Sequence, residues 1–170
     1  TDQAGNPYAG ISDPTALVFT TADTTAPVLV TTSPLDGTTG VAVDTNITLT
    51  FTEPVYAAAG TITIHHTDTG TVVEAIPATG GQVTGSGTAT ITVDPAVTLG
   101  SNANYYITIA PGAFQDSSGN PYAGISDPTS LNFTSVDPGA PLLVSSTPVD
   151  DAIGVAVDTN LVFTFYEPVY

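Results

Sequence analysis

The segment GVAVDTNITLTFTEPVY (residues 40–56) decides the fold class. Within it, Ile47, Leu49 and Phe51 alternate with threonines. A period of two places successive side chains on opposite faces of a β-strand. We therefore expect a strand at 46–52 whose three apolar side chains face a core, while the threonines face water or a neighbour.

The same segment returns near the end of the chain as GVAVDTNLVFTFYEPVY (residues 154–170). The copy extends well beyond it, because residues 1–56 align with 115–170 at a constant offset of 114, with 35 of 56 positions identical. The apolar positions stay apolar, as Leu161, Phe163 and Phe165. A period of 114 residues is the size of a whole domain rather than of a solenoid repeat.

Polar, proline-bearing stretches at 21–27 and 135–141 mark the linkers between the repeats. They divide the chain into the tail of one module (1–22), a complete module (23–136) and the head of a third (137–170). Neither terminal piece has enough strands to fold alone. We expect either a window on a longer tandem array or a unit whose ends are completed by neighbouring chains.

Helix signals are missing, and short alternating runs rich in Thr, Val and Ile are separated by turn residues. This pattern predicts an all-β, Ig-like Greek-key sandwich. The strands expected in the complete module are 28–32, 46–52, 61–66, 71–76, 82–84, 88–93, 104–110 and 129–134.

Two local features support this architecture. Asp68-Thr69-Gly70 is typical of a hairpin turn between two alternating runs. Leu99, followed six residues later by Tyr105, resembles a tyrosine corner, in which the hydroxyl reaches back to the backbone at the start of a sandwich strand. Tyr105, Ile107 and Ile109 would then point inward.

The residues that carry these features also resemble a known family. The order SP-x-DG-x-x-GV-x-VDTNITLTF-x-EPV (33–55), L-x(5)-YYITI (99–109) and FQDSSGNPYAG…LNFT (114–134) is similar to the bacterial Ig-like domain typified by S-layer protein repeats. The resemblance implies a seven-stranded sandwich, export to the cell surface and tandem use in adhesins, S-layers and multidomain exoproteins. It carries no catalytic residues over to this chain.

The charge balance excludes several classes of function. The 170 residues contain 16 acidic side chains and no Lys or Arg, which gives a formal net charge of −16. Such a chain cannot neutralise phosphates, so we expect neither nucleic-acid binding nor attachment to anionic membranes. It has no Cys and no apolar run long enough to span a bilayer. The unpaired carboxylates favour calcium among biological cations, unless salt and solvent alone screen them.

Sandwich topology gathers the carboxylates at two poles. One pole of the complete module would hold Asp23, Glu53, Asp116 and Asp127, and the equivalent pole of the next module would include Asp137 and Glu167. These six residues are the candidate Ca²⁺ ligands at the module junctions. The remaining loops place other acids at the opposite pole, namely Asp36, Asp44, Asp68 and Asp94. The alternative is that these acids form Asx-turns, such as Asp127-Pro128, and solubilise the surface.

Catalysis is not expected from this sequence. His65 and His66 are adjacent in a predicted strand, so they point to opposite faces and do not readily bind one metal ion together. The Gly80-Gly81 pair does not precede a helix, as a phosphate-binding loop requires.

Three functions remain after these exclusions. The chain is expected to be a spacer or stalk in a secreted surface adhesin, stiffened by calcium where modules meet. One alternative is the subunit of an extracellular filament or S-layer, a homopolymer in which strands from one chain complete the next. Another is an accessory carbohydrate-binding module, for which the candidate aromatic residues are Tyr8, Tyr56, Tyr122 and Tyr170.

Overall fold

The computed structural model describes residues 1–137, 139–165 and 169. The secondary structure assigned within them consists of strands, turns and bends. In chain order the strands are β1 (Leu29–Ser33), β2 (Thr38–Val41), β3 (Ile47–Ala57), β4 (Thr61–His66), β5 (Val72–Pro77), β6 (Val83–Thr84), β7 (Thr88–Val93), β8 (Asn104–Ile109), β9 (Phe114–Gln115), β10 (Asn132–Ser135), β11 (Leu143–Thr147) and β12 (Val162–Phe165).

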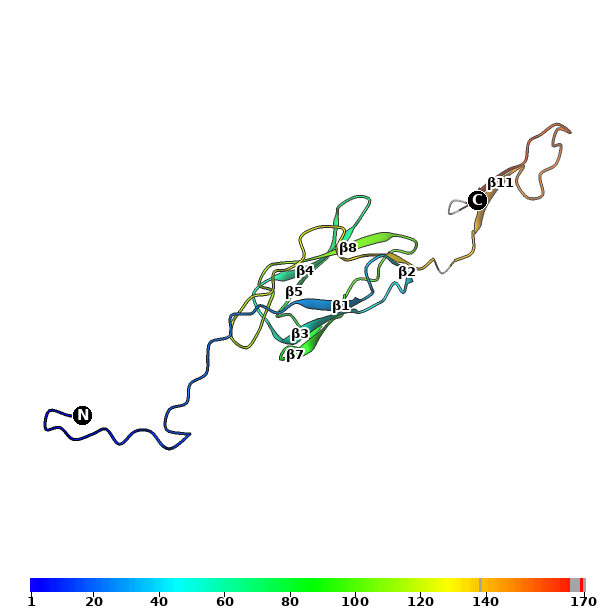
Figure 1. Ribbon diagram of the computed structural model, residues 1–170. Coiled ribbons are helices and arrows are strands. Elements are labelled where there is room, and N and C mark those ends of the chain that lie inside the picture. Colours follow the sequence, from blue (N-terminus) through cyan, green and yellow to red (C-terminus); the bar gives the residue numbers. More distant parts are fainter. Residues whose placement is uncertain (138, 166–168, 170) are drawn as a thin grey trace.

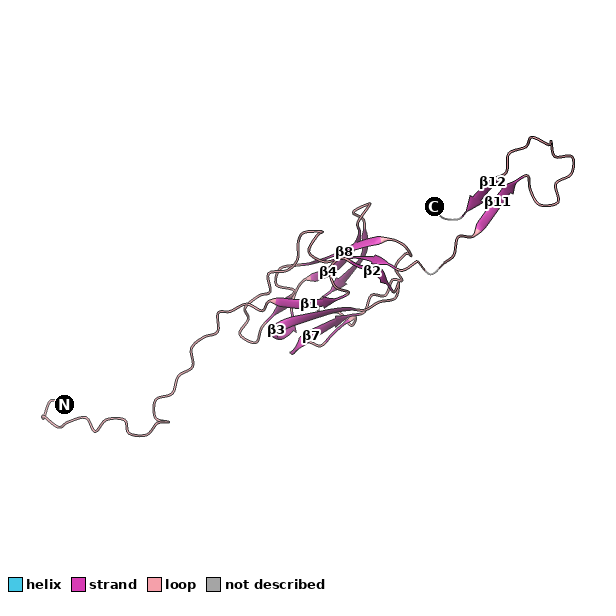
Figure 2. Cartoon of the chain, turned by 45° about the vertical axis from the view of Figure 1, so that its right-hand side comes forward, coloured by secondary structure: helices cyan, strands magenta, loops and turns pink. Residues whose placement is uncertain are grey.

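The first ten strands form a β-sandwich, so the predicted fold class is confirmed. One sheet has the order β1-β3-β7-β6, with β9 paired to the far end of β3, and the other has the order β2-β10-β8-β4-β5. All these pairings are antiparallel except that of β2 with β10, which is parallel. Figure 2 shows the two layers packed face to face.

The core forms between the inner faces of the two sheets, where the period-two pattern predicted it. Ile47, Leu49 and Phe51 on β3 are buried, as are Tyr105, Ile107 and Ile109 on β8. The threonines that alternate with the β3 residues are partly or fully exposed. Burial of these large apolar side chains, each of which contributes about 1.5–3 kcal/mol, provides most of the driving force for folding.

The two predicted local motifs are present. The β4–β5 turn closes through a hydrogen bond of 2.8 Å from Gly70 N to His66 O, and Gly70 has a φ of 66°, which glycine adopts without strain. The Tyr105 hydroxyl accepts a hydrogen bond of 2.8 Å from Gly100 N. This contact fixes the loop after Leu99 against the start of β8, as a tyrosine corner does.

Two strands were not predicted from the sequence. β2 and β9 are short, and each exists because a distant segment pairs with it: β2 with β10, and β9 with the end of β3. With the short β6, they raise the number of strands within residues 29–135 to ten, instead of the seven that the family resemblance implied. The predicted strand at 129–134 begins later, at Asn132.

The chain enters and leaves the sandwich at opposite ends (Figure 1). At the entry, Val28 O accepts a hydrogen bond of 2.9 Å from Thr52 N, just before β1. At the exit, Val136 N donates a hydrogen bond of 2.7 Å to Val41 O, just after β10. The long axis of the sandwich therefore lies along the path of the chain.

The two terminal pieces lie outside the sandwich (Figure 1). Residues 1–22 contain turns but no strand, and they are exposed. In the C-terminal piece, β11 and β12 form a separate two-stranded sheet. Within the described ranges, no helix has the length and apolar character needed to cross a membrane.

Candidate functional site

Three carboxylates meet at the end of the sandwich where the chain enters. Asp23, Glu53 and Asp116 each offer one carboxylate oxygen, and these oxygens all lie within 4.8 Å of one another. They come from the segment before β1, from β3 and from the loop after β9, so 93 residues separate the first from the last. Oxygen atoms at this spacing suit a calcium ion, which takes six to eight oxygen ligands.

Asp116 is the most rigidly held of the three, and its side chain is only 2% exposed. One carboxylate oxygen accepts hydrogen bonds of 2.8 Å from the backbone N–H groups of Ser118 and Asn120, and the other accepts 2.7 Å from Asn120 Nδ2. Pairing of β9 with β3 places this loop beside the end of β3.

Glu53 lies where the pairing of β3 with β7 loses its register, between Thr50 and Val55. A β-bulge changes the direction in which a side chain points, and Pro54 cannot donate a ladder hydrogen bond. Glu53 therefore lies at a bulge-like irregularity of the strand. Its carboxylate reaches the Asp116 loop at the sandwich end.

Asp23 lies in the segment that leads into β1. Its carboxylate accepts a hydrogen bond of 2.9 Å from Thr25 N, and its backbone carbonyl accepts one of 3.1 Å from Asn120 Nδ2. Asn120 therefore holds both Asp116 and the linker. The sequence interpretation did not select this residue, although the repeated NPY motif that contains it was a usable signal.

The cluster carries uncompensated negative charge. Partial burial raises the pKa of Glu53, and the charges of Asp116 and Asp23 raise it further. Burial acts in the same direction on Asp116, but the hydrogen bonds from Asn120, Ser118 and Gly119 outweigh it and lower the pKa of that carboxyl. Asp116 therefore stays ionised. The repulsion among the three carboxylates acts on Glu53, and a bound cation would relieve it.

Two of the other three candidate ligands, Asp127 and Asp137, are not part of this cluster. Asp127 accepts hydrogen bonds from Thr129 and Ser130 in its own turn, and these lower its pKa to about 2. Asp137 accepts a hydrogen bond of 3.1 Å from Gly139 N, beyond the exit from the sandwich. Glu167 lies outside the described residues.

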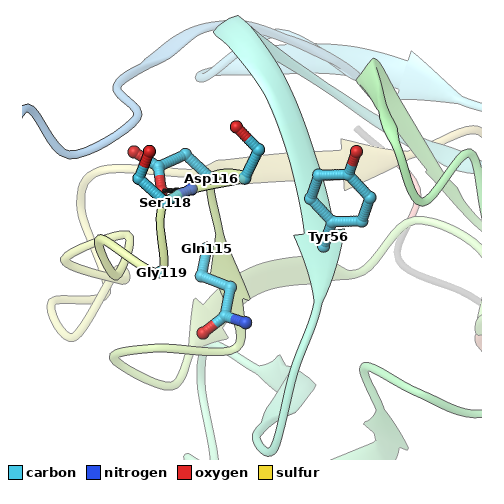
Figure 3. A pocket seen from close by; sticks show the side chains of 6 residues that line it. Tyr56, Gln115, Asp116, Ser118 and Gly119 are labelled. Carbon is cyan, nitrogen blue, oxygen red and sulfur yellow. Dashed lines mark hydrogen bonds between the residues drawn. The ribbon is translucent and has the colours of Figure 1, made fainter. Parts of the chain in front are cut away.

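A surface hollow of about 470 Å³ lies beside the cluster. It is lined by Tyr56, Gln115 and the loop from Asp116 to Gly119 (Figure 3). Among the aromatic residues considered as candidates for carbohydrate binding, Tyr56 lines this hollow. Tyr122 is only 6% exposed and packs edge-on against Phe51 at 5.2 Å, so it cannot stack on a carbohydrate.

The two histidines lie in β4 and contact different partners. The His65 ring stacks on Tyr106 at 4.5 Å, and its Nε2 lies 3.0 Å from Thr108 Oγ1. The His66 ring meets the buried Tyr105 edge-on at 5.6 Å. The two rings therefore pack against different neighbours.

Comparison with known proteins identifies the domain. The family model described as the bacterial Ig-like domain matches residues 23–135. The chain belongs to this family. The resemblance found in the sequence is thereby confirmed, and residues 23–135 are a bacterial Ig-like structural domain. No curated protein matches the chain.

Two solved structures resemble this Ig-like domain weakly. One is CopC from Methylosinus trichosporium OB3b, at 20% identity and a TM-score of 0.49, with 67% of this chain and 97% of that chain covered. The other is the S-layer protein rSbsC(31-844), at 20% identity and a TM-score of 0.42, with 72% of this chain and 15% of that chain covered. At these values neither likeness bears on function.

Proposed function

We propose that the Ig-like domain is one repeat of a secreted bacterial surface protein, in which it acts as a non-catalytic spacer in a long adhesin. The observation that supports this is the combination of a 114-residue repeat with entry and exit of the chain at opposite ends of the sandwich. Modules joined in this way extend along one line. Each repeat therefore adds length to the stalk.

The array can be tested with a longer chain that carries three consecutive complete repeats. Small-angle scattering should give a maximum dimension that increases by a constant amount for each repeat added. A dimension that does not increase with repeat number would show that the modules fold back on one another, and it would contradict a spacer function.

We further propose that calcium binds to Asp23, Glu53 and Asp116 and stiffens the entry to each module. The support is the distance of 4.8 Å or less between their oxygens, together with the raised pKa of Glu53. Asp23 belongs to the linker, whereas the other two residues belong to the sandwich. A shared ion would therefore fix the linker to the module. In the following repeat, Asp137 and Glu167 hold the positions equivalent to Asp23 and Glu53.

Thermal melting of the full chain tests this site. Millimolar CaCl₂ should raise the Tm by more than NaCl of equal ionic strength. In Glu53→Gln, the Tm without calcium should be equal or higher, because the repulsion is gone, and the gain from calcium should disappear. The control Asp68→Asn, in the exposed β4–β5 turn, should keep the gain. Equal effects of the two salts would exclude a specific site.

Assembly into a filament is the second candidate function. The observation that favours it is that β12 leaves large apolar side chains exposed, including Phe163. By the 114-residue offset, the two terminal pieces correspond to residues 115–136 and 23–56 of the module. Negative-stain imaging with and without calcium tests for polymers directly.

A further inference from the structure

We propose that the surface hollow beside Tyr56 is a binding site for a neutral saccharide. The inference goes beyond the spacer function and does not depend on the calcium site. The hollow measures about 470 Å³ and is lined by Tyr56, Gln115 and the loop from Asp116 to Gly119 (Figure 3). Pockets for small molecules usually measure about 300–1,000 Å³, so the hollow has the size of such a site.

Tyr56 supplies an aromatic surface that the backbone holds in place. The residues before and after it are tied to the turn that precedes β7. Gly87 N donates a hydrogen bond of 2.7 Å to Val55 O, and Ala57 N donates one of 3.1 Å to Ser86 Oγ. The ring packs against Gly87, where an added Cβ would lie 3.4 Å from Tyr56 Cε1, yet the residue is 43% exposed. A side chain fixed in advance loses little conformational entropy when it contacts a ligand.

Polar side chains surround this ring. Gln115 lies opposite Tyr56 in the β3–β9 pair, so the two side chains lie on the same face of the strands. The loop after β9 adds the hydroxyls of Ser117 and Ser118. Ser118 binds Asp116 through its backbone N–H, which leaves its hydroxyl available. Between the residues that the structure describes, no hydrogen bond uses the side chains of Gln115 or Ser117.

A ligand rich in hydroxyls suits these groups. Each hydroxyl of a sugar both donates and accepts hydrogen bonds, and amides, hydroxyls and carboxylates can therefore all pair with it. The C–H groups on one face of a sugar ring pack on an aromatic ring, whose face carries partial negative charge. The hollow offers both kinds of contact side by side.

The charge of the site selects among ligands. Asp116 lines the hollow, its carboxylate lies within 4.8 Å of those of Glu53 and Asp23, and the chain has no Lys or Arg. An anionic sugar would be repelled without a compensating cation. Sites for organic cations enclose the charge within several aromatic rings, whereas Tyr56 is the one aromatic residue among those that line this hollow. A neutral saccharide is therefore the ligand class that fits.

Titration of the full chain with neutral disaccharides tests the site. Cellobiose, maltose and lactose are added at millimolar concentrations in EDTA, so that no divalent cation contributes. NMR follows the backbone amide signals of residues 115–119. At least one disaccharide should shift these signals and leave those of the β4–β5 turn unchanged. A lack of response to all three would overturn the proposal, as would tighter binding of glucuronate or of choline.

Two variants locate the contact. Tyr56→Leu keeps a large apolar side chain in β3 but removes the aromatic face, so the Kd should increase about tenfold or more. Ser118→Ala removes one hydroxyl and should increase the Kd about threefold. The N-terminal copy of this loop already has Ala4 at the equivalent position, and Ala4 N still donates a hydrogen bond of 2.9 Å to Asp2. Ser118→Ala should therefore leave the turn intact.

Tyr8→Leu is the matched control, because Tyr8 is 74% exposed and lies outside the sandwich. This variant should bind as the wild type does, and an equal loss in Tyr8→Leu and Tyr56→Leu would overturn the proposal. An unchanged Kd in Tyr56→Leu would overturn it as well. The dispersion of the amide signals shows whether Tyr56→Leu is folded, and if it is not, Ser118→Ala decides in its place. None of these results would alter the scattering or calcium tests.

Discussion

The pair β1–β3 inside the sandwich and the pair β11–β12 outside it have the same register. Leu29 lies opposite Phe51, and Leu143 lies opposite Phe165. Each partner is shifted by 114 residues, and the remaining pairs, including the register shift near the start, follow the same offset. The sequence of these two strands thus specifies their pairing without the rest of the module.

Burial differs sharply between the two pairs. Leu49 is 0% exposed and its counterpart Phe163 is 55% exposed, while Ile47 and Leu161 are 1% and 71% exposed. The second pair lacks the opposite sheet that covers the first. Register is therefore set by the two strands themselves, whereas burial, and with it most of the stability, comes from β4, β8 and β10.

The loops show the same contrast between structure that is encoded locally and structure that depends on the rest of the module. In the N-terminal piece, Asp2 accepts hydrogen bonds from Ala4 N, Asn6 N and Asn6 Nδ2, all at 2.9 Å. These bonds match those that Asp116 accepts in the module, within 0.2 Å. The turn is thus encoded locally. Only in the module does it bring a carboxylate to Glu53 and Asp23.

The largest expected effect distinguishes the two strand pairs. Leu49→Ala should lower the free energy of unfolding by about 2–5 kcal/mol, because it leaves a cavity in the core. Phe163→Ala should change it by less than about 0.5 kcal/mol, because that side chain has no core to lose. Urea unfolding of the full chain measures both. A large loss in Phe163→Ala would mean that β12 packs on the module in solution.

A smaller effect is expected for the matched asparagines. Asn120→Ala removes the hydrogen bonds from Nδ2 to Asp116 and to the Asp23 carbonyl, at a cost of about 1–3 kcal/mol. Asn6→Ala removes the same local bond in a turn that supports no other structure, so the urea midpoint should not move. Equal midpoints for the two variants would show that the Asp116 loop contributes nothing to the sandwich.

The smallest effect concerns pH. The pKa of Asp127 falls from 3.8 to about 2 in the folded module, because Ser130 and Thr129 donate hydrogen bonds to it. A lowered folded-state pKa contributes stability above about pH 4, and this contribution is lost as the pH falls toward about 2. Asp127→Asn should therefore flatten the acid limb of a plot of Tm against pH.

Asp13 provides the control for this measurement. Thr15 lowers its pKa in the same kind of turn, but the turn lies outside the sandwich, so Asp13→Asn should leave the profile unchanged.

The pKa of Glu53 shifts in the opposite direction to that of Asp127. Its raised pKa means that protonation favours the folded state, so Tm should rise as the pH falls through that pKa. Glu53→Gln should remove this rise.

The side of each strand that faces the core could be predicted, because it depends on the alternation of apolar and polar residues within that strand. The alternation through Ile47, Leu49 and Phe51 and the Leu99–Tyr105 spacing both correspond to contacts in the structure. The hairpin turn at Gly70 was found for the same reason, since a turn is specified by the few residues within it.

The strand β2 could not be predicted, and the repeat explains why. The letters GVAVDTN occur at 40–46 and again at 154–160, yet a strand forms at Thr38–Val41 and not at the equivalent residues 152–155. β10 is present only for the first copy. The conformation of this segment is therefore determined by its partner across the sandwich, which no local pattern reveals.

The candidate site shows the same limit. Topology alone was sufficient to bring Asp23, Glu53 and Asp116 together, because strand ends at one pole converge. It grouped Asp127 with them as well, and it missed Asn120. The sequence does not specify that the Asp127 side chain turns back to Ser130, or that one amide connects the loop to the linker.

The identical register of β1–β3 and β11–β12 would also affect how the proposed tandem array folds during synthesis. β3 emerges from the ribosome long before β10, the last strand of the module, and β12, a near-copy of β3, follows soon after β10. A module that has not yet folded is therefore exposed to a second strand that specifies the same pairing. Exchange between adjacent repeats is the characteristic misfolding hazard of such chains.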